Sequence, residues 1–194
     1  MNIINLLVGA KFLSLIKEGK YTSRLTKTGE AGSLKWSSKE LDDLLKNRLD
    51  RSSCPNSISI GILCFLFVIL YIGGSGMILD YCDLPIKPGV LVSLSLITVI
   101  SIIVSTIPYS LGRGYNFGLT LVLALYLFDI LLTLIGIFFM VISSIELDNF
   151  QMQLILFPVQ ALLLYFCHYM MNSDNFSRVV LFFRIKRSVQ EANK

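Results

Sequence analysis

The middle of the chain carries four long stretches in which apolar residues follow one another with little interruption. They cover residues 58–79, 89–111, 118–145 and 151–171, and the one charged residue inside them is Asp129. Since a helix needs about 20 apolar residues to cross the hydrocarbon core of a bilayer, each stretch predicts a membrane-spanning helix. Backbone hydrogen bonds in lipid must close within each segment, which disfavours open strands. The pattern predicts an all-α polytopic membrane protein.

Small and polar residues recur within each stretch at alternating spacings of three and four. This spacing is typical of left-handed helix packing, and small or polar side chains in lipid mark the faces that meet other helices. We therefore expect an antiparallel four-helix bundle, and the Gly-rich run at 73–76 predicts a close approach or a kink. The expected packed positions are Gly61, Cys64, Val68, Tyr71 and Ser75; Leu94, Thr98, Ser101, Ser105 and Pro108; Tyr126, Asp129, Thr133, Gly136, Met140 and Ser143; and Gln153, Leu156, Gln160, Leu163, Cys167 and Met170.

The segment before the first stretch, residues 1–56, predicts a cytoplasmic arm with helices of its own. Residues 2–16 are strongly apolar with a few polar positions, which is typical of a short helix at the membrane interface. Residues 19–36 are rich in Gly, Thr, Ser and Lys, and they predict a loop or a small hairpin.

A second amphipathic helix is predicted to begin at residue 37. The sequence Ser-Ser-Lys-Glu at 37–40 is a capping box, and Trp36 and Leu41 form the matching hydrophobic staple. The apolar stripe of this helix must bury against the N-terminal helix, a second subunit or a soluble protein, and we interpret it as a partner-binding surface. Its residues are Trp36, Leu41, Leu44, Leu45 and Leu49.

The last segment, residues 172–194, combines apolar and basic positions. Ser173 or Asp174 can cap a helix that alternates apolar residues with four cations. Such a helix is suited to anionic lipid headgroups, so membrane lipid is an expected partner and nucleic acid is not. The residues expected at the membrane surface are Arg178, Arg184, Lys186 and Arg187.

The distribution of charge supports a membrane protein and predicts how the chain is oriented in the membrane. Charged residues make up 15% of the 194, against about 25% in soluble domains, and only 7 of the 30 lie within residues 57–171. This excludes a soluble globular protein, a disordered chain and a disulfide scaffold. With four spans, all of the 17 Lys and Arg residues except Lys87 fall on one side. The positive-inside rule then predicts cytoplasmic termini in a bacterial inner membrane.

Asp129 is the residue with the highest insertion cost. It lies eleven residues past position 118, or about 16 Å along a helix, close to the middle of the bilayer. An ionised carboxylate there costs roughly 2.5–3.5 kcal/mol, so we expect it to carry a proton or to be held by the hydroxyls of Thr98, Ser101 and Thr133. Two roles remain open: a proton- or cation-handling site, and a hydrogen-bonding residue that fixes helix register or oligomeric state.

Motifs for catalysis and for cofactors are absent from the sequence. It has no phosphate-binding loop, no nucleophile elbow, no H-E-x-x-H and no C-x-x-C, and it has a single histidine. We therefore expect no catalytic residues, no cofactor and no metal site, and we predict that the protein is not an enzyme.

The leading interpretation is a membrane subunit that forms homo-oligomers and recruits or regulates a cytosolic protein. In length, span number and cytoplasmic termini the chain resembles small four-span subunits of bacterial anti-phage defence systems, in particular the membrane subunit of the Kiwa system. The resemblance implies a sensor of membrane perturbation that signals to a cytosolic DNA-binding subunit. Two alternatives are a small oligomeric transporter or channel that uses Asp129, and an immunity protein against a pore-forming toxin.

Overall fold

The computed structural model describes residues 3–27, 57–82, 85–143 and 150–192, and this part of the chain is helical and contains no strand. The all-α prediction is therefore confirmed for these residues. The expected helix from residue 37, with its apolar stripe from Trp36 to Leu49, lies outside them. The helices are α1 (Ile3–Val8), α2 (Ala10–Lys27), α4 (Ile58–Tyr81), α5 (Ile86–Gly112), α6 (Asn116–Ser143), α7 (Phe150–Met171) and α8 (Asp174–Ala192).

Three of the helices are long and apolar enough to cross a membrane. Their apolar segments are Ile58–Leu79 in α4, Lys87–Gly112 in α5 and Asn116–Phe139 in α6. In α7 the corresponding apolar segment, Leu156–Met171, is shorter. The three long segments indicate a membrane-embedded protein.

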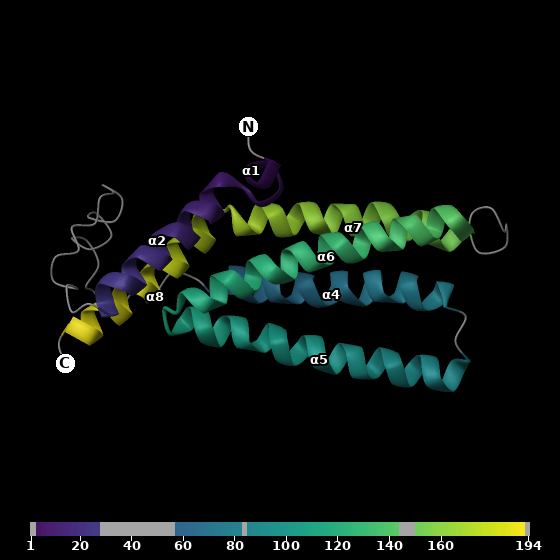
Figure 1. Cartoon of the computed structure of the whole chain (residues 1–194), viewed down its shortest axis with the longest axis horizontal. Coiled ribbons are helices and arrows are strands. Elements are labelled where there is room, and N and C mark those ends of the chain that lie inside the picture. The colour runs from purple at the N-terminus through teal and green to yellow at the C-terminus, as the bar shows by residue number, and fades with distance from the viewer. Residues whose placement is uncertain (1–2, 28–56, 83–84, 144–149, 193–194) are drawn as a thin grey trace.

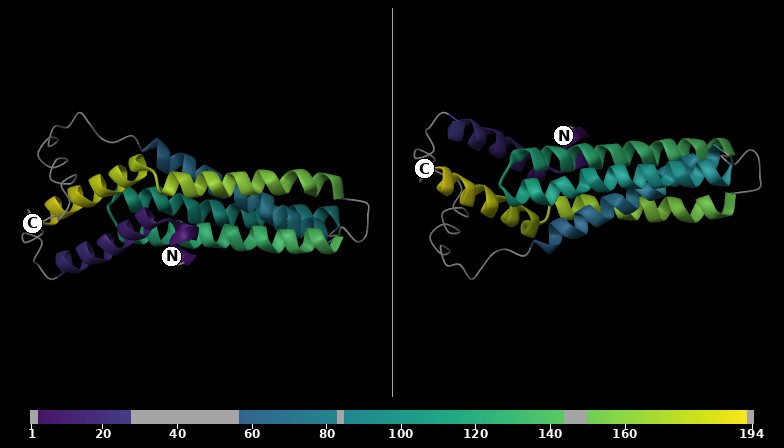
Figure 2. Two further views of the ribbon diagram at one scale, coloured as in Figure 1. Left: turned by 90° about the horizontal axis from the view of Figure 1, so that it is seen from above. Right: turned by 90° about the horizontal axis from the view of Figure 1, so that it is seen from below.

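The four long helices α4 to α7 lie side by side, with α4 in contact with the other three (Figures 1 and 2). The buried face of α4 repeats at the 3-4-3 spacing of Ile60, Leu63, Phe67 and Leu70. Its close approach to α6 depends on a glycine, because a Cβ added at Gly74 would lie 3.2 Å from the Leu132 side chain. The close approach predicted for the glycine-rich run at 73–76 is thus confirmed at this position.

The turn between α5 and α6 is a Schellman motif. The Gly114 N–H donates to the Leu111 carbonyl, and the Tyr115 N–H donates to the Ser110 carbonyl, at 2.9 and 3.0 Å. Gly114 adopts a φ of +71°, a conformation that glycine takes without steric cost. The motif ends α5 and reverses the chain into α6.

The predicted packed face is wrong for α5. Leu94, Thr98, Ser101, Ser105 and Pro108 are all exposed on the described chain. Their place is taken by bulky apolar residues, which are Ile100, Val104, Ile107 and Leu111. The hydroxyls of Thr98 and Ser105 each donate to a carbonyl of their own helix, at 2.8 Å, so they need no partner from another helix.

On α4 the predicted face is displaced by one residue. Gly61 is exposed and Tyr71 is buried, whereas Cys64, Val68 and Ser75 are only partly buried. On α6 the prediction is confirmed, since Tyr126, Asp129, Thr133 and Gly136 are all buried. On α7 Gln160 and Cys167 are buried, Leu163 and Met170 are partly buried, and Leu156 is exposed. The side chains of Met140, Ser143 and Gln153 lie outside the described set.

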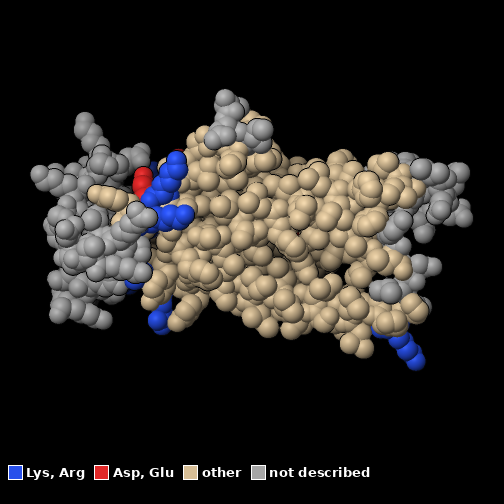
Figure 3. Space-filling model, viewed as in Figure 1, with Lys and Arg blue, Asp and Glu red and all other residues tan. Residues whose placement is uncertain are grey.

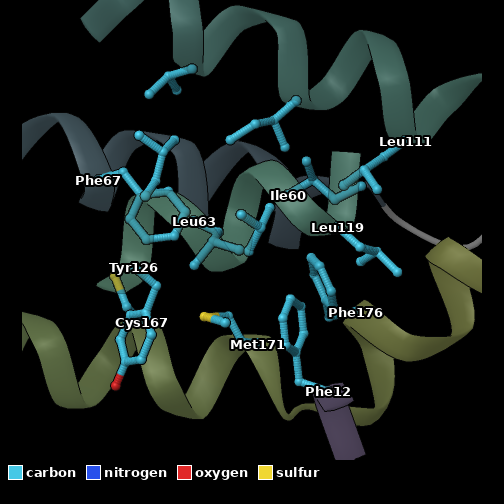
Figure 4. Packing of buried hydrophobic residues seen from close by; sticks show 14 of the residues in the cluster. Phe12, Ile60, Leu63, Phe67, Leu111, Leu119, Tyr126, Cys167, Met171 and Phe176 are labelled. Atoms are coloured by element: carbon cyan, nitrogen blue, oxygen red, sulfur yellow. The ribbon is translucent and has the colours of Figure 1, made fainter. Parts of the chain in front are cut away.

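The N-terminal segment differs from the prediction in two ways. The chain breaks at Gly9, where φ is +90°, and α2 then continues as a helix to Lys27, so the loop expected from residue 19 is wrong over 19–27. Gly19 serves close packing rather than a turn, because a Cβ there would lie 2.1 Å from Asn116 Oδ1. Helix α2 also buries Phe12 against Phe176 of α8, with ring centroids 6.0 Å apart, beside Met171 (Figure 4).

The helix α8 begins as the sequence predicts. The Ser173 hydroxyl accepts a hydrogen bond from the Phe176 N–H at 3.2 Å, which is an N-cap. Phe176, Val179 and Val180 are then buried on one face of α8. Both α2 and α8 project beyond the end of the long helices (Figure 1) and contact each other.

Candidate functional site

Asp129 lies on α6 with only 2% of its surface exposed, and neither of its carboxyl oxygens has a hydrogen-bond partner. The Thr133 hydroxyl donates to the backbone carbonyl of Asp129 at 2.8 Å, not to its side chain. Thr98 and Ser101 face away from the protein on α5. The prediction that these three hydroxyls hold the carboxyl group is therefore wrong, because each lies on the wrong face or bonds to the backbone.

Polar groups of two other helices surround Asp129. Tyr71 of α4 and Cys167 of α7 lie near enough for electrostatic interaction with its carboxyl group. Figure 4 shows Cys167 beside the ring of Tyr126, the residue one turn before Asp129 on α6. We call Asp129, Tyr71, Cys167 and Gln160 the polar centre.

Gln160 is the second buried polar side chain of the polar centre, with 2% of its surface exposed. Its Nε2 donates to the Leu70 carbonyl of α4 at 3.3 Å, and its Oε1 has no partner. Gly73 makes room for it, since a Cβ there would lie 1.8 Å from Gln160 Nε2. Gly73 precedes Gly74, which packs on Leu132 of α6, so Gln160 lies within about one helical turn of Asp129 in depth.

The polar centre therefore contains three buried acceptor atoms without a hydrogen-bond partner. Two carboxyl oxygens and one amide oxygen are buried without partners, and such atoms cost free energy unless a proton, a water or a cation satisfies them. In the described residues no group of three His, Cys, Asp or Glu side chains could hold a metal ion. A proton on the Asp129 carboxyl group would remove the charge from this buried position.

A second cluster joins α1 and α2 to the ends of the long helices. Asn172, between α7 and α8, accepts a hydrogen bond from the Phe12 N–H at 3.2 Å and donates to the Val8 carbonyl at 3.0 Å and to the His168 carbonyl at 2.9 Å. The Tyr126 hydroxyl donates to the Leu7 carbonyl at 3.2 Å. Asn172 thus bridges the break between α1 and α2, and Tyr126 ties α1 to α6.

Arg184 of α8 is buried, with 5% exposed, so the prediction of a membrane-surface role is wrong for this residue. Its Nη2 donates to the Leu15 carbonyl of α2 at 3.1 Å and to Asn116 Oδ1 of α6 at 3.4 Å. Burial lowers the pKa of Arg184 to about 10, with Glu18 acting in the opposite direction, so it stays charged at neutral pH. The long guanidinium side chain fastens α8 to α2 and α6.

The other three predicted surface cations remain outside the core. Arg178 and Lys186 are exposed, and the Arg187 guanidinium lies 4.1 Å from the centroid of the Tyr115 ring. The sequence did not single out Asn172 or Gly9. The sequence feature that could have indicated the break at Gly9 is a glycine between two apolar runs, which is also typical of an ordinary turn.

Replacing Asn172 by alanine is expected to loosen the connection between α1 and α2. Three hydrogen bonds end on this side chain, and at about 1 kcal/mol each the loss amounts to about 2–3 kcal/mol. The measurement is the melting temperature in mild detergent, with Asn175→Ala as a control because Asn175 is exposed. Equal melting temperatures for the two variants would contradict the role of Asn172.

Comparisons of the chain with protein-family models, curated proteins and solved structures find no match. The class defined by the fold is an all-helical, membrane-embedded protein with three helices long and apolar enough to span a bilayer.

Proposed function

We propose that this protein is a non-enzymatic, multi-pass subunit of a bacterial inner membrane that forms homo-oligomers and recruits or regulates a cytosolic protein. In this proposal α4 to α7 form an antiparallel four-helix bundle that spans the membrane. The first and last segments of the chain, including α2 and α8, lie in the cytoplasm.

The length of α7 and the placement of cations support the bundle. Its 22 residues correspond to about 33 Å, enough to cross a hydrocarbon core. Among the described residues, cations gather at the end of the molecule where α2 and α8 lie (Figure 3), and Lys87 is an exposed cation in the first turn of α5. That asymmetry favours cytoplasmic termini.

The observation that carries the proposed role is the set of polar connections between the projecting helices and the long ones. Asn172 and Arg184 bond to the backbone of α1 and α2, and Tyr126 bonds to α1 from a position one turn from Asp129. We therefore expect a displacement of α6 or α7 to be transmitted to α2 and α8. This is the arrangement expected of a subunit that senses the membrane and passes the change to a cytosolic partner.

The proposed setting is bacterial anti-phage defence, on the resemblance in layout to the Kiwa membrane subunit. The partner would then be a cytosolic DNA-binding protein, held by the cytoplasmic arm that includes Leu41, Leu44 and Leu45. The stimulus would be the local disturbance of the membrane during phage attachment or injection.

Co-expression with the product of the neighbouring gene tests this role. We expect the chain to purify in mild detergent as an oligomer with that soluble protein bound, and the pair to lower phage plating. Asn172→Ala should reduce plating protection while Asn175→Ala leaves it unchanged. A monomer that binds no neighbouring product would contradict the proposal.

The unpartnered carboxyl group of Asp129 favours one second candidate, a small transporter or channel for protons or cations. Purified protein in liposomes that contain a pH-sensitive dye tests it. Flux that is lost in Asp129→Asn but kept in Thr133→Val would support transport. Absence of flux in the unmodified protein would exclude it.

A further inference from the structure

A groove of about 750 Å³ opens at the corner where α7 passes into α8, beside the first turn of α2. Two exposed cations line it, Lys11 of α2 and Arg178 of α8. His168 of α7 also lines it, and the Nε2 atom of this histidine is buried without a hydrogen-bond partner. Two cations and one histidine from three helices therefore border a single cavity.

One carboxylate shares the groove with these groups. The Lys11 ammonium donates a hydrogen bond to Asp174, and this bond, together with the charge of Lys11, lowers the pKa of Asp174. The pair is exposed, with 42% of the Lys11 side chain and 74% of the Asp174 side chain accessible. Exposed ion pairs contribute little to stability, so a stronger anion can displace Asp174 from Lys11 at small cost.

The groove begins on the last turns of the apolar helix α7. Tyr165 and Tyr169 border it and are 63% and 61% exposed. Tyrosine is enriched at the level of lipid headgroups, where its ring lies in apolar material and its hydroxyl reaches water. If α7 spans the membrane as proposed, the groove extends from the edge of the hydrocarbon to the cationic side chains on α2 and α8.

We propose that this groove binds a phosphate group, supplied by the headgroup of an anionic phospholipid. The Arg178 guanidinium offers paired N–H donors that match phosphate oxygens, and Lys11 adds a point charge. The imidazole of His168 lines the same groove. The inference rests on the membrane position of α7 and is independent of the partner and of the role in defence.

Native mass spectrometry of the full-length protein in mild detergent tests the site. Phosphatidylglycerol, phosphatidylcholine and inorganic phosphate are added in turn. We expect phosphatidylglycerol to bind most tightly, and Arg178→Gln to weaken it roughly tenfold, since charge-assisted bonds are the strong ones. Lys186→Gln is the matched control, because Lys186 is an exposed cation of α8 outside the groove.

Asp174→Asn separates binding from a purely structural role of Lys11. If Lys11 serves the lipid, removing its carboxylate competitor should tighten phosphatidylglycerol binding severalfold, whereas Lys11→Gln should weaken it. If Lys11 matters only through its ion pair, the two variants should weaken binding alike, which would contradict the proposal. Equal losses in Arg178→Gln and Lys186→Gln, or preference for inorganic phosphate over the lipid, would also overturn it.

Discussion

Replacing Asp129 by leucine is expected to raise the melting temperature of the purified protein and, for the transport candidate, to abolish flux. Both carboxyl oxygens are buried without a partner, so the native side chain is a net cost to the fold. Leucine has the same branching at Cγ and removes that cost. Exchange of a buried polar group for an apolar one of similar shape commonly gains a few kcal/mol, and we expect about 2–3 kcal/mol here.

Two controls define the meaning of this experiment. Thr133→Val removes the neighbouring hydroxyl, which bonds only to the backbone, and it should change stability by less than about 1 kcal/mol. Asp129→Asn keeps the shape and removes the titratable proton. A fall in melting temperature for Asp129→Leu would show that the carboxyl group serves helix packing, the other role that the sequence leaves open.

Replacing Gly114 by alanine is expected to be the most destabilising of the substitutions considered. The φ of +71° disfavours any residue with a Cβ, at about 1–2 kcal/mol. The added Cβ would also lie 2.6 Å from the Phe183 carbonyl oxygen and 3.1 Å from the Arg184 Cα. These are backbone atoms of α8 that cannot rotate away, so we expect a total loss of about 3 kcal/mol or more.

Gly112→Ala is the matched control, two residues earlier in the same turn. A Cβ at Gly112 meets no atom within 4 Å. The stability of both variants is measured by melting curves, and the attachment of α8 is measured by its sensitivity to protease. If Gly114→Ala left α8 as protected as Gly112→Ala does, the close contact between the α5–α6 turn and α8 would be refuted.

Local patterns predict the four long helices α4 to α7 well because each apolar run is long and uninterrupted. The predicted face of α6 is also right: the carboxyl oxygens of Asp129 find no partner on their own helix, and the side chain lies on the buried face. The face of α5 is wrong for the opposite reason. The hydroxyls of Thr98 and Ser105 are satisfied by carbonyls of their own helix, so polarity there says nothing about the packed side.

Local sequence patterns could not predict the contacts that join α2, α6 and α8 at the end of the molecule. The sequence around Arg184 is typical of a helix with cations on its surface, so it predicts an exposed side chain. The partners of Arg184, Leu15 and Asn116, are 169 and 68 residues away in sequence. Gly19 is likewise typical of a turn in the sequence. In the structure, its lack of a Cβ leaves room for the side chains of Asn116 and Arg184. Contacts so distant along the chain leave no periodic trace in the sequence.

The exposed hydroxyl row of α5 has a mechanical consequence. Only 17% of the apolar segment of α5 is buried by protein, against 39% for α4 and for α6. The hydroxyls of Ser95, Thr98, Ser105 and Thr106 bond to carbonyls of their own helix, so they do not tie α5 to its neighbours. In the proposed bilayer, lipid therefore contacts a larger share of α5 than of α4 or α6. We expect a local disturbance of the lipid to displace α5 before the other two.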